Sequence, residues 1–339
     1  MYISSMRKSI ILTLLAALLL TACSPKSERA AQLPPSRGLP YELAVIIPQA
    51  LYQGALKDTL EAVLKASTPV LNQHEPMFRV DVVYGEANLT AWRTMRNRLL
   101  VSVEADAEKP TLGVARNVVA RPQIEVKVTA RNAQELAAFI GAQRQRLTDL
   151  FVDCELEVEA ARLRRKYSRM TADSLQRFGH RICVPDGLYA AKVGQDFLWT
   201  GTNLNDRDQN FVFYSYAWNG CPLTSEQYVA KRDSVMCINI PGAQAGQWMQ
   251  TATVTSHDDS LAREPLIMSR MRTIGGASVH EVHGLWEMRG AALGGAFVAL
   301  ERIDTGARRV LVTEGFIYSP HSPKRNLMRQ MEAALRTFE

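Results

Sequence analysis

Several patterns that identify common enzyme classes are missing from this chain of 339 residues. None of its five cysteines stands in a C-x-x-C pair, which argues against a thioredoxin-like redox centre and against a zinc ribbon. No G-x-x-x-x-G-K-[ST] segment marks a P-loop, and no G-x-S-x-G segment forms the nucleophile elbow of a hydrolase. Long hydrophobic runs are also missing. The apolar residues 10–20 are too few for a membrane-spanning helix, which needs about 20.

That short apolar run is typical of a bacterial export signal. Arg7 and Lys8 precede it, and Leu20-Thr21-Ala22-Cys23 follows as a lipobox, so residues 1–22 are expected to be a lipoprotein signal peptide. Cys23 would carry the acyl chains, and several chains on one cysteine hold a protein stably to a membrane. Because Ser24 rather than Asp follows, and no acidic cluster comes next, we expect an outer-membrane anchor facing the periplasm.

The segment after the lipobox differs in composition from the rest of the chain. Residues 23–40 are polar and rich in proline, with nothing that could form a core, and they predict a flexible tether. We expect two folded units after it, residues 41–170 and residues 171–339. Their hydrophobic content and length suffice for packed cores.

Charge narrows the choice of partners. The net charge is +6, and removal of the signal peptide would leave +4, which is too mild to indicate nucleic-acid binding. No pattern calls for a cofactor. The expected partners are the membrane, through the N-terminal lipid, and an envelope protein or polymer whose identity the sequence leaves open.

Periodicity predicts an α+β fold with two halves, each a largely antiparallel sheet packed by a closing helix. Residues 123–129 alternate cleanly between apolar and polar, as in a sheet with one wet face. A long helix is predicted over residues 132–166, capped by Asn132. In the second half, residues 279–288, 296–303 and 309–318 read as strands. A terminal helix is expected from Ser322-Pro323 to Phe338.

The cysteines allow more than one arrangement. Four remain besides Cys23, and an oxidising compartment permits disulfides among them. Cys154 falls on the apolar stripe of the long helix, which favours a free buried thiol. Cys221 and Cys237 form the disulfide pair to test first.

A histidine pair near the C-terminus resembles a metal motif only superficially. His280 and His283 are three residues apart, whereas a metalloprotease helix places its histidines four apart. On a strand, residues i and i+3 point to opposite faces, so the two imidazoles are not expected to bind one ion, and no metal site is predicted. The following glycines, at residues 290–295, predict a turn between two strands.

One group of residues is a candidate for a binding groove, provided that their strands are neighbours. In the competing interpretation the tryptophan packs in the core and the charges face solvent. The candidates are Trp286, Glu287, Arg289, Arg302 and Glu314.

Four blocks in the last third of the chain carry a family resemblance. They are KRDSV (231–235), NIPGAQAGQWMQT (239–251), HGLWEMRGAALGGAFV (283–298) and EGFIYSPHSPKRNLMRQMEAAL (314–335). The sequence resembles a family of bacterial envelope lipoproteins catalogued as domain of unknown function 4837. The resemblance implies a lipoprotein with no assigned activity and no catalytic residue to carry over. It also implies that His283 stands where members usually have arginine. More distantly, the second half is similar to PsbP-type α/β/α sandwiches, which is an analogy of fold alone.

These observations favour a membrane-anchored envelope protein that acts by binding or scaffolding. Two other functions stay open: a periplasmic hydrolase acting on envelope polymers, and a protein that handles lipid or lipopolysaccharide. Converging titratable side chains in a deep pocket would favour the hydrolase. An elongated apolar cavity would favour the lipid-handling protein.

Overall fold

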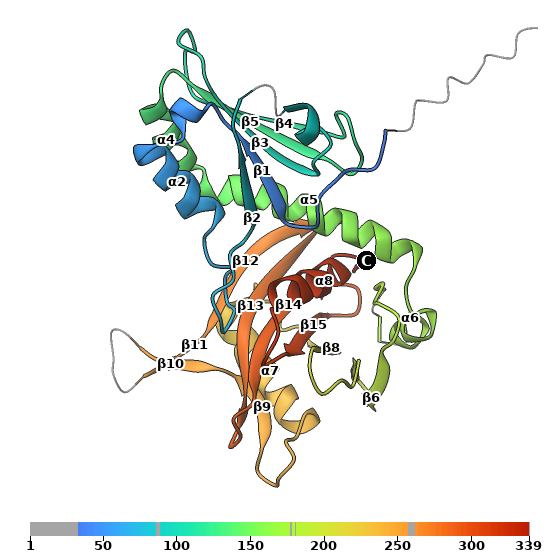
Figure 1. The fold of residues 1–339 in the computed structure, drawn as a ribbon. Helices are drawn as coiled ribbons and strands as arrows, with labels where there is room; N and C mark the ends of the chain where they lie inside the picture. Colours follow the sequence, from blue (N-terminus) through green and yellow to red (C-terminus); the bar gives the residue numbers. More distant parts are fainter. Residues whose placement is uncertain (1–32, 86–88, 177, 180, 257–261, 339) are drawn as a thin grey trace, which may run out of the picture.

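The computed structural model describes residues 33–85, 89–176, 178–179, 181–256 and 262–338. They form two β-sheets, each with its own helices, and the α+β class with two halves is confirmed. Figure 1 shows the smaller sheet above the larger one, with helix α5 (Arg144–Arg165) running between them. None of the helices in the described ranges has the length and apolar character needed to span a bilayer.

The sheet of the first half has the order β2-β1-β3-β5-β4. Its arrangement corrects the expected antiparallel sheet, because β1 pairs in parallel with β2 and β3, and β3 pairs in parallel with β5. Only β4 is antiparallel to its neighbour. Parallel neighbours need crossover connections, and helix α2 supplies the first of these between β1 and β2. The strands are β1 (Glu42–Ile46), β2 (Arg79–Val83), β3 (Asn97–Val103), β4 (Thr111–Arg116) and β5 (Ile124–Ala130).

Helices cover one face of this sheet. Apolar side chains of α2 (Gly54–Leu64), α4 (Ala133–Ala142) and α5 share a core with β1, β3 and β5. A short 3-10 helix (Gln49–Leu51) precedes α2, and α3 (Leu89–Trp92) lies between β2 and β3. The Asn132 side chain accepts a hydrogen bond from the Glu135 amide at 2.9 Å, which confirms the predicted cap.

The predicted long helix is two helices, divided at Gln143. Helix α4 packs on α2 and the first sheet, whereas α5 continues toward the second half and packs on α8. The chain has to change direction between these two surfaces, and Gly141, a weak helix former, lies beside the break.

The predicted tether is shorter than residues 23–40. Backbone bonds join Arg37 N to Thr94 O (2.8 Å) and Arg121 N to Pro34 O (2.9 Å), so residues 34–37 are held along the first half. Composition did not predict this, because the bonds use backbone groups that a polar, proline-rich segment still carries.

The sheet of the second half is antiparallel throughout, in the order β12-β13-β14-β15-β8-β7-β6, with β9 also paired to β13. Helix α7 (Ser225–Asn239) packs on one face and α8 (Arg325–Leu335) on the other. The strands are β6 (Tyr189–Val193), β7 (Phe197–Gly201), β8 (Asp208–Ala217), β9 (Trp248–Thr251), β12 (Ile267–Ile274), β13 (Ala277–Arg289), β14 (Gly294–Asp304) and β15 (Arg309–Tyr318).

Several elements of the second half differ from the sequence predictions. The predicted glycine-rich turn is confirmed, since β13 and β14 pair across it as a hairpin. Residues 181–184 have no regular secondary structure. Several elements were not predicted. They include helices α6 (Arg169–Gln176) and α7, strand β12, and the pairing of β10 (Thr253–Thr255) with β11 (Arg263–Pro265) in a small hairpin. The terminal helix begins at Arg325, with Lys324 rather than Ser322 at its N-cap.

Candidate functional site

The five groove candidates do not line one groove. Trp286 and Glu314 are buried on the α7 face of the large sheet, and the indole of Trp286 donates to Ile317 O at 3.1 Å. Arg302 lies on the opposite face, over the ring of Phe338 at 5.3 Å. A sheet therefore separates Arg302 from Trp286 and Glu314.

The two remaining candidates pair with strand β9. Glu287 accepts a hydrogen bond from the Gln250 side chain at 2.9 Å. The guanidinium of Arg289 lies 4.6 Å from the centre of the Trp248 ring. Both contacts are cross-strand pairs that hold β9 to β13, so they do not face the other three candidates.

Cys154, Cys221 and Cys237 are free thiols. Cys221 and Cys237 are both exposed free thiols, so the pair chosen for a disulfide test is not bonded. The two lie on different elements, a turn after β8 and the last turn of α7. Cys154 is buried and free as predicted, and burial raises the pKa of its thiol to about 11. Cys23 lies outside the described residues.

A buried ion pair stands under helix α7. Arg232 and Glu314 have fully buried side chains, and Arg232 Nη2 lies 2.8 Å from Glu314 Oε1. The hydroxyl of Tyr228, one turn earlier on α7, donates to Glu314 Oε2 at 3.0 Å. The Arg232 guanidinium also lies 4.0 Å from the centre of the Phe297 ring. Every one of these contacts is made inside the core, and they hold α7 against the sheet.

Helix α7 and its buried arginine were not predicted, although the sequence carries a signal for them. Thr224 precedes the helix, and its side chain accepts from the Gln227 amide at 3.3 Å, a capping pattern readable from the residues. Tyr228, Arg232 and Met236 then recur every four residues as a single buried stripe. A charged residue in that stripe indicates a buried partner.

The two imidazoles lie on opposite faces of β13, as expected for residues three apart on a strand. His280 faces α7, where Nδ1 lies 2.7 Å from Glu301 Oε2. His283 is on the α8 side, and its Nε2 lies 3.2 Å from Glu281 Oε1. The sheet separates the two imidazoles, because residues three apart on a strand point to opposite faces.

A cavity of about 70 Å³ opens between the two halves, and we name it the junction cleft. The first half contributes the loop before β2 and one side of α5. The second half contributes β12, β13 and α8. Its apolar lining includes Val70, Leu71, Met77, Met268 and Met328, and its charged lining includes Asp149, Arg270, His283, Arg329 and Glu332.

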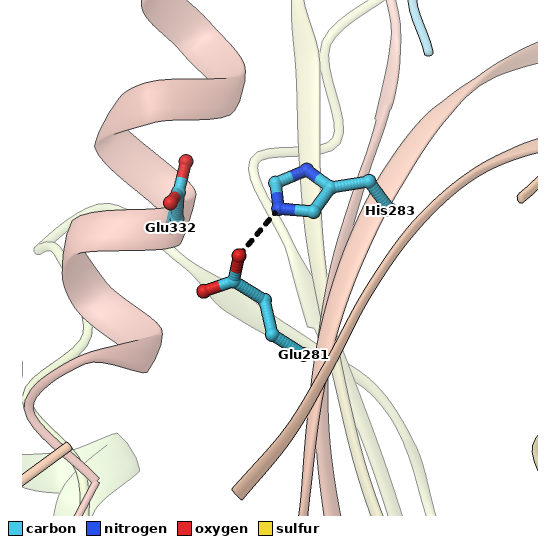
Figure 2. A group of neighbouring side chains, drawn as sticks. All are labelled: Glu281, His283 and Glu332. Atoms are coloured by element: carbon cyan, nitrogen blue, oxygen red, sulfur yellow. Dashed lines mark hydrogen bonds and ion pairs between the residues drawn. The ribbon is translucent and has the colours of Figure 1, made fainter. Parts of the chain in front are cut away.

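His283 and Glu332 line the junction cleft, and the buried carboxylate of Glu281 lies beside them. Figure 2 shows Glu281 and His283 on β13 facing Glu332 on α8. One ligand atom from each of the three lies within 4.8 Å of the others, a spacing that a metal ion could bridge. Glu281 and Glu332 are almost fully buried, while His283 is partly exposed.

Guanidinium groups already neutralise both carboxylates. Arg270 Nε lies 3.1 Å from Glu281 Oε1, and Arg329 Nη1 lies 2.6 Å from Glu332 Oε2. Arg336 Nη2 lies 3.1 Å from Glu332 Oε1. A cation would have to displace these charges, so the chemistry of this cluster favours an ion-pair network over a metal site.

The same network joins the halves. Asp149 and Asp153, one turn apart on α5, bind arginines of β12: Arg270 at 3.0 Å and Arg272 at 2.6 Å. Arg336 of α8 also reaches Asp153, at 2.8 Å. Because each aspartate belongs to the first half and each arginine to the second, these pairs set how the halves meet.

The network lowers the pKa of its two glutamates. Burial alone would raise the pKa of Glu281, but the hydrogen bond from His283 and nearby positive charges outweigh it, so the pKa lies well below its usual range. Burial likewise opposes ionisation of Glu332, yet the charges of Arg329 and Arg336 lower its pKa. Both groups are therefore ionised at neutral pH.

Acid is expected to weaken the junction through Glu281. A lowered folded-state pKa contributes stability that is complete above the ordinary value of 4.5 and is lost as pH falls toward the folded value. Glu281→Gln should reduce the free energy of unfolding by about 2 kcal/mol at pH 7 and by less at pH 3. Urea unfolding of both proteins from pH 7 to pH 3 measures this. Parallel pH curves would contradict the assignment.

The fold and the cleft define an α+β protein whose two halves are joined through a helix pair and partly buried ion pairs. The chain belongs to the family described as Domain of unknown function (DUF4837), whose profile matches residues 168–337. All four blocks that carried the resemblance lie in that range. The first half, residues 36–164, matches a different family, also described as Domain of unknown function (DUF8532).

Other comparisons add little. No curated protein matches the sequence. Structures of a Mog1 mutant and of the Saccharomyces cerevisiae Ran-binding protein Mog1p are 10% and 9% identical; each has a TM-score of 0.30 and covers 47% of this chain and 88% of its own. The lipid transfer and protein localization domain of human StarD13 is 11% identical, with a TM-score of 0.23, and covers 44% of this chain and 86% of its own. At these scores the likeness carries no argument about function.

Proposed function

We propose that the protein is a lipid-anchored envelope protein that binds a partner through the junction cleft, without catalysis. The anchor rests on the lipobox that ends at Cys23. The binding site rests on one observation: the cleft is a concave surface lined by both halves, with an apolar wall beside a charged floor. A protein or polymer segment with one apolar group beside a polar one fits that lining.

The chemistry of the cleft favours binding over the two rival functions. A hydrolase needs a nucleophile or an acid and base free to act, whereas the carboxylates here are tied to arginines. A lipid-handling protein needs a long apolar cavity, and about 70 Å³ holds only about five water molecules. The cleft thus suits the tip of a side chain or a sugar more than an acyl chain.

Strand β12 offers a matched pair of positions to test the proposal. Met268 lines the cleft and is 43% exposed, whereas Met271 is 56% exposed on the other face of the same strand. A photoreactive amino acid at 268, but not at 271, should cross-link one discrete partner in intact membranes. The cross-linked products are separated on a denaturing gel after purification of the protein, and the partner in each shifted band is identified by mass spectrometry.

Two controls separate the parts of this proposal. Leu71→Arg, which places charge on the apolar wall, should abolish the product at 268. Equal cross-linking at both positions, or no product at either, would overturn the cleft as the binding site. Cys23→Ser should release the protein from the membrane fraction, and retention after that change would remove the lipid anchor.

A further inference from the structure

A cluster of exposed cationic and apolar side chains surrounds the point where the described chain begins. We name it the tether-exit surface and define it as Leu33, Arg37, Arg93, Val118 and Arg121. All five are exposed, Leu33 by 39% and Val118 by 46%. It lies on the first half, and Figure 1 shows that the chain enters there, far from the β13–β14 turn.

Backbone hydrogen bonds bring the three arginines together from three parts of the chain. Arg121 bonds the segment of residues 34–36 on one side, from Arg121 N to Pro34 O and from Ser36 N to Arg121 O. On the other side, Arg37 N donates to Thr94 O, next to Arg93. The three arginines are therefore neighbours even though 84 positions separate the first from the last in sequence.

No carboxylate among the described residues neutralises the charge of this surface. Within the described ranges, none of the three guanidiniums forms an ion pair with a carboxylate, and Arg37 only contacts Ala91 O at 3.4 Å. The nearby Arg116 differs, since Glu157 binds it at 2.6 Å. Three unpaired cations beside two exposed aliphatic groups are the combination that attracts a protein to anionic lipid headgroups.

The length of the tether places the surface close to a membrane. Nine residues lie between Cys23 and Leu33, which makes ten steps from one residue to the next. A fully extended chain covers at most about 3.5 Å per step, so the reach is about 35 Å. A lipid on Cys23 would hold this part of the protein within that distance. The opposite end of the second half would extend away from the bilayer.

We propose that the tether-exit surface docks on the anionic phospholipid leaflet that carries the anchor, so that the junction cleft is held at a set height above the bilayer. The inference rests on the proposed anchor at Cys23. Each arginine near a membrane surface contributes about fivefold to the docked population, and salt screens this contribution beyond about 10 Å at 0.1 M.

The test uses the full acylated protein in vesicles of phosphatidylcholine with 30% phosphatidylglycerol. An environment-sensitive fluorescent amino acid is placed at Val118 or, as a control of similar exposure, at Leu293 in the β13–β14 turn (40% exposed). A quencher on the lipid headgroups should quench position 118 several-fold more than position 293. The difference should disappear in pure phosphatidylcholine or at 1 M salt.

Matched charge reversals complete the design. Arg93→Glu with Arg121→Glu should abolish the quenching at position 118, whereas Lys231→Glu with Arg289→Glu, two exposed cations of the second half, should leave it unchanged. Thermal unfolding checks that both double variants fold. Equal quenching at the two positions in acylated protein would overturn this inference alone. Absence of acylation, read from the mass of the N-terminal peptide, would instead overturn the anchor.

Discussion

Arg232→Ala is expected to lower the free energy of unfolding by about 3–5 kcal/mol. The substitution removes the guanidinium group of Arg232, whose nitrogens donate to the carboxylate of Glu314. The side chain of Glu314 is fully buried. An ionised carboxylate without a cation in the core has to take up a proton or draw in water, and both are costly. Urea denaturation followed by circular dichroism measures the change.

Two controls show whether burial is the cause. Arg309→Ala breaks the pair with Asp304, whose two side chains are about a third exposed, and should cost less than about 1 kcal/mol. Replacing both members of the buried pair, Arg232→Met with Glu314→Leu, should recover much of the loss, because no charge is then left unpaired. If Arg232→Ala cost no more than Arg309→Ala, the buried pair would not hold α7 in place.

Gly295→Ala is expected to be the second most harmful change, at about 3 kcal/mol. A Cβ at this position would lie 2.0 Å from Ile317 O and 2.9 Å from Trp286 Nε1. The first of these atoms is backbone in β15, so it cannot move without shifting the strand. The methyl group would also disturb the bond from Trp286 to Ile317 O.

Gly113→Ala is the matched control. It stands on the edge strand β4, and a Cβ there would meet nothing within 4 Å. Alanine at that position should be neutral or slightly stabilising, because it restricts the unfolded chain. If Gly113→Ala and Gly295→Ala lowered the stability by similar amounts, the close approach of Ile317 O to Gly295 would not explain the loss at position 295.

The strands near the C-terminus were predictable from local pattern. Strand β13 alternates between half-buried and buried residues from His283 to Met288, whereas β14 follows the glycine turn as an apolar run that is buried on both faces. The period of a strand also placed His280 and His283 on opposite faces. Strand β12 was missed because it is an edge strand with arginines at positions 270 and 272, which bind the aspartates of α5. Its polar character comes from a contact distant in sequence, which periodicity does not register.

The residues of the candidate site were likewise predictable only in part. The sequence identified Glu314 and Trp286 as notable and left open whether the tryptophan packs in the core. It could not tell that Glu314 is buried too, because that burial depends on α7 packing against the sheet. Glu281, Glu332 and Arg336 were not singled out at all. Nothing in their local sequence distinguishes a charge in a buried network from a charge in water.

Local pattern by itself determined the α+β class, the strands on both sides of the glycine turn, the cap at Asn132, the free buried thiol of Cys154 and the family resemblance. These properties depend on neighbours within a few residues, where periodicity and capping act. Only the tertiary structure decided the parallel order of the first sheet, the burial of Arg232 with Glu314, and the junction cleft. These depend on which distant surfaces meet, since burial turns ordinary charged side chains into partners that cannot be removed singly.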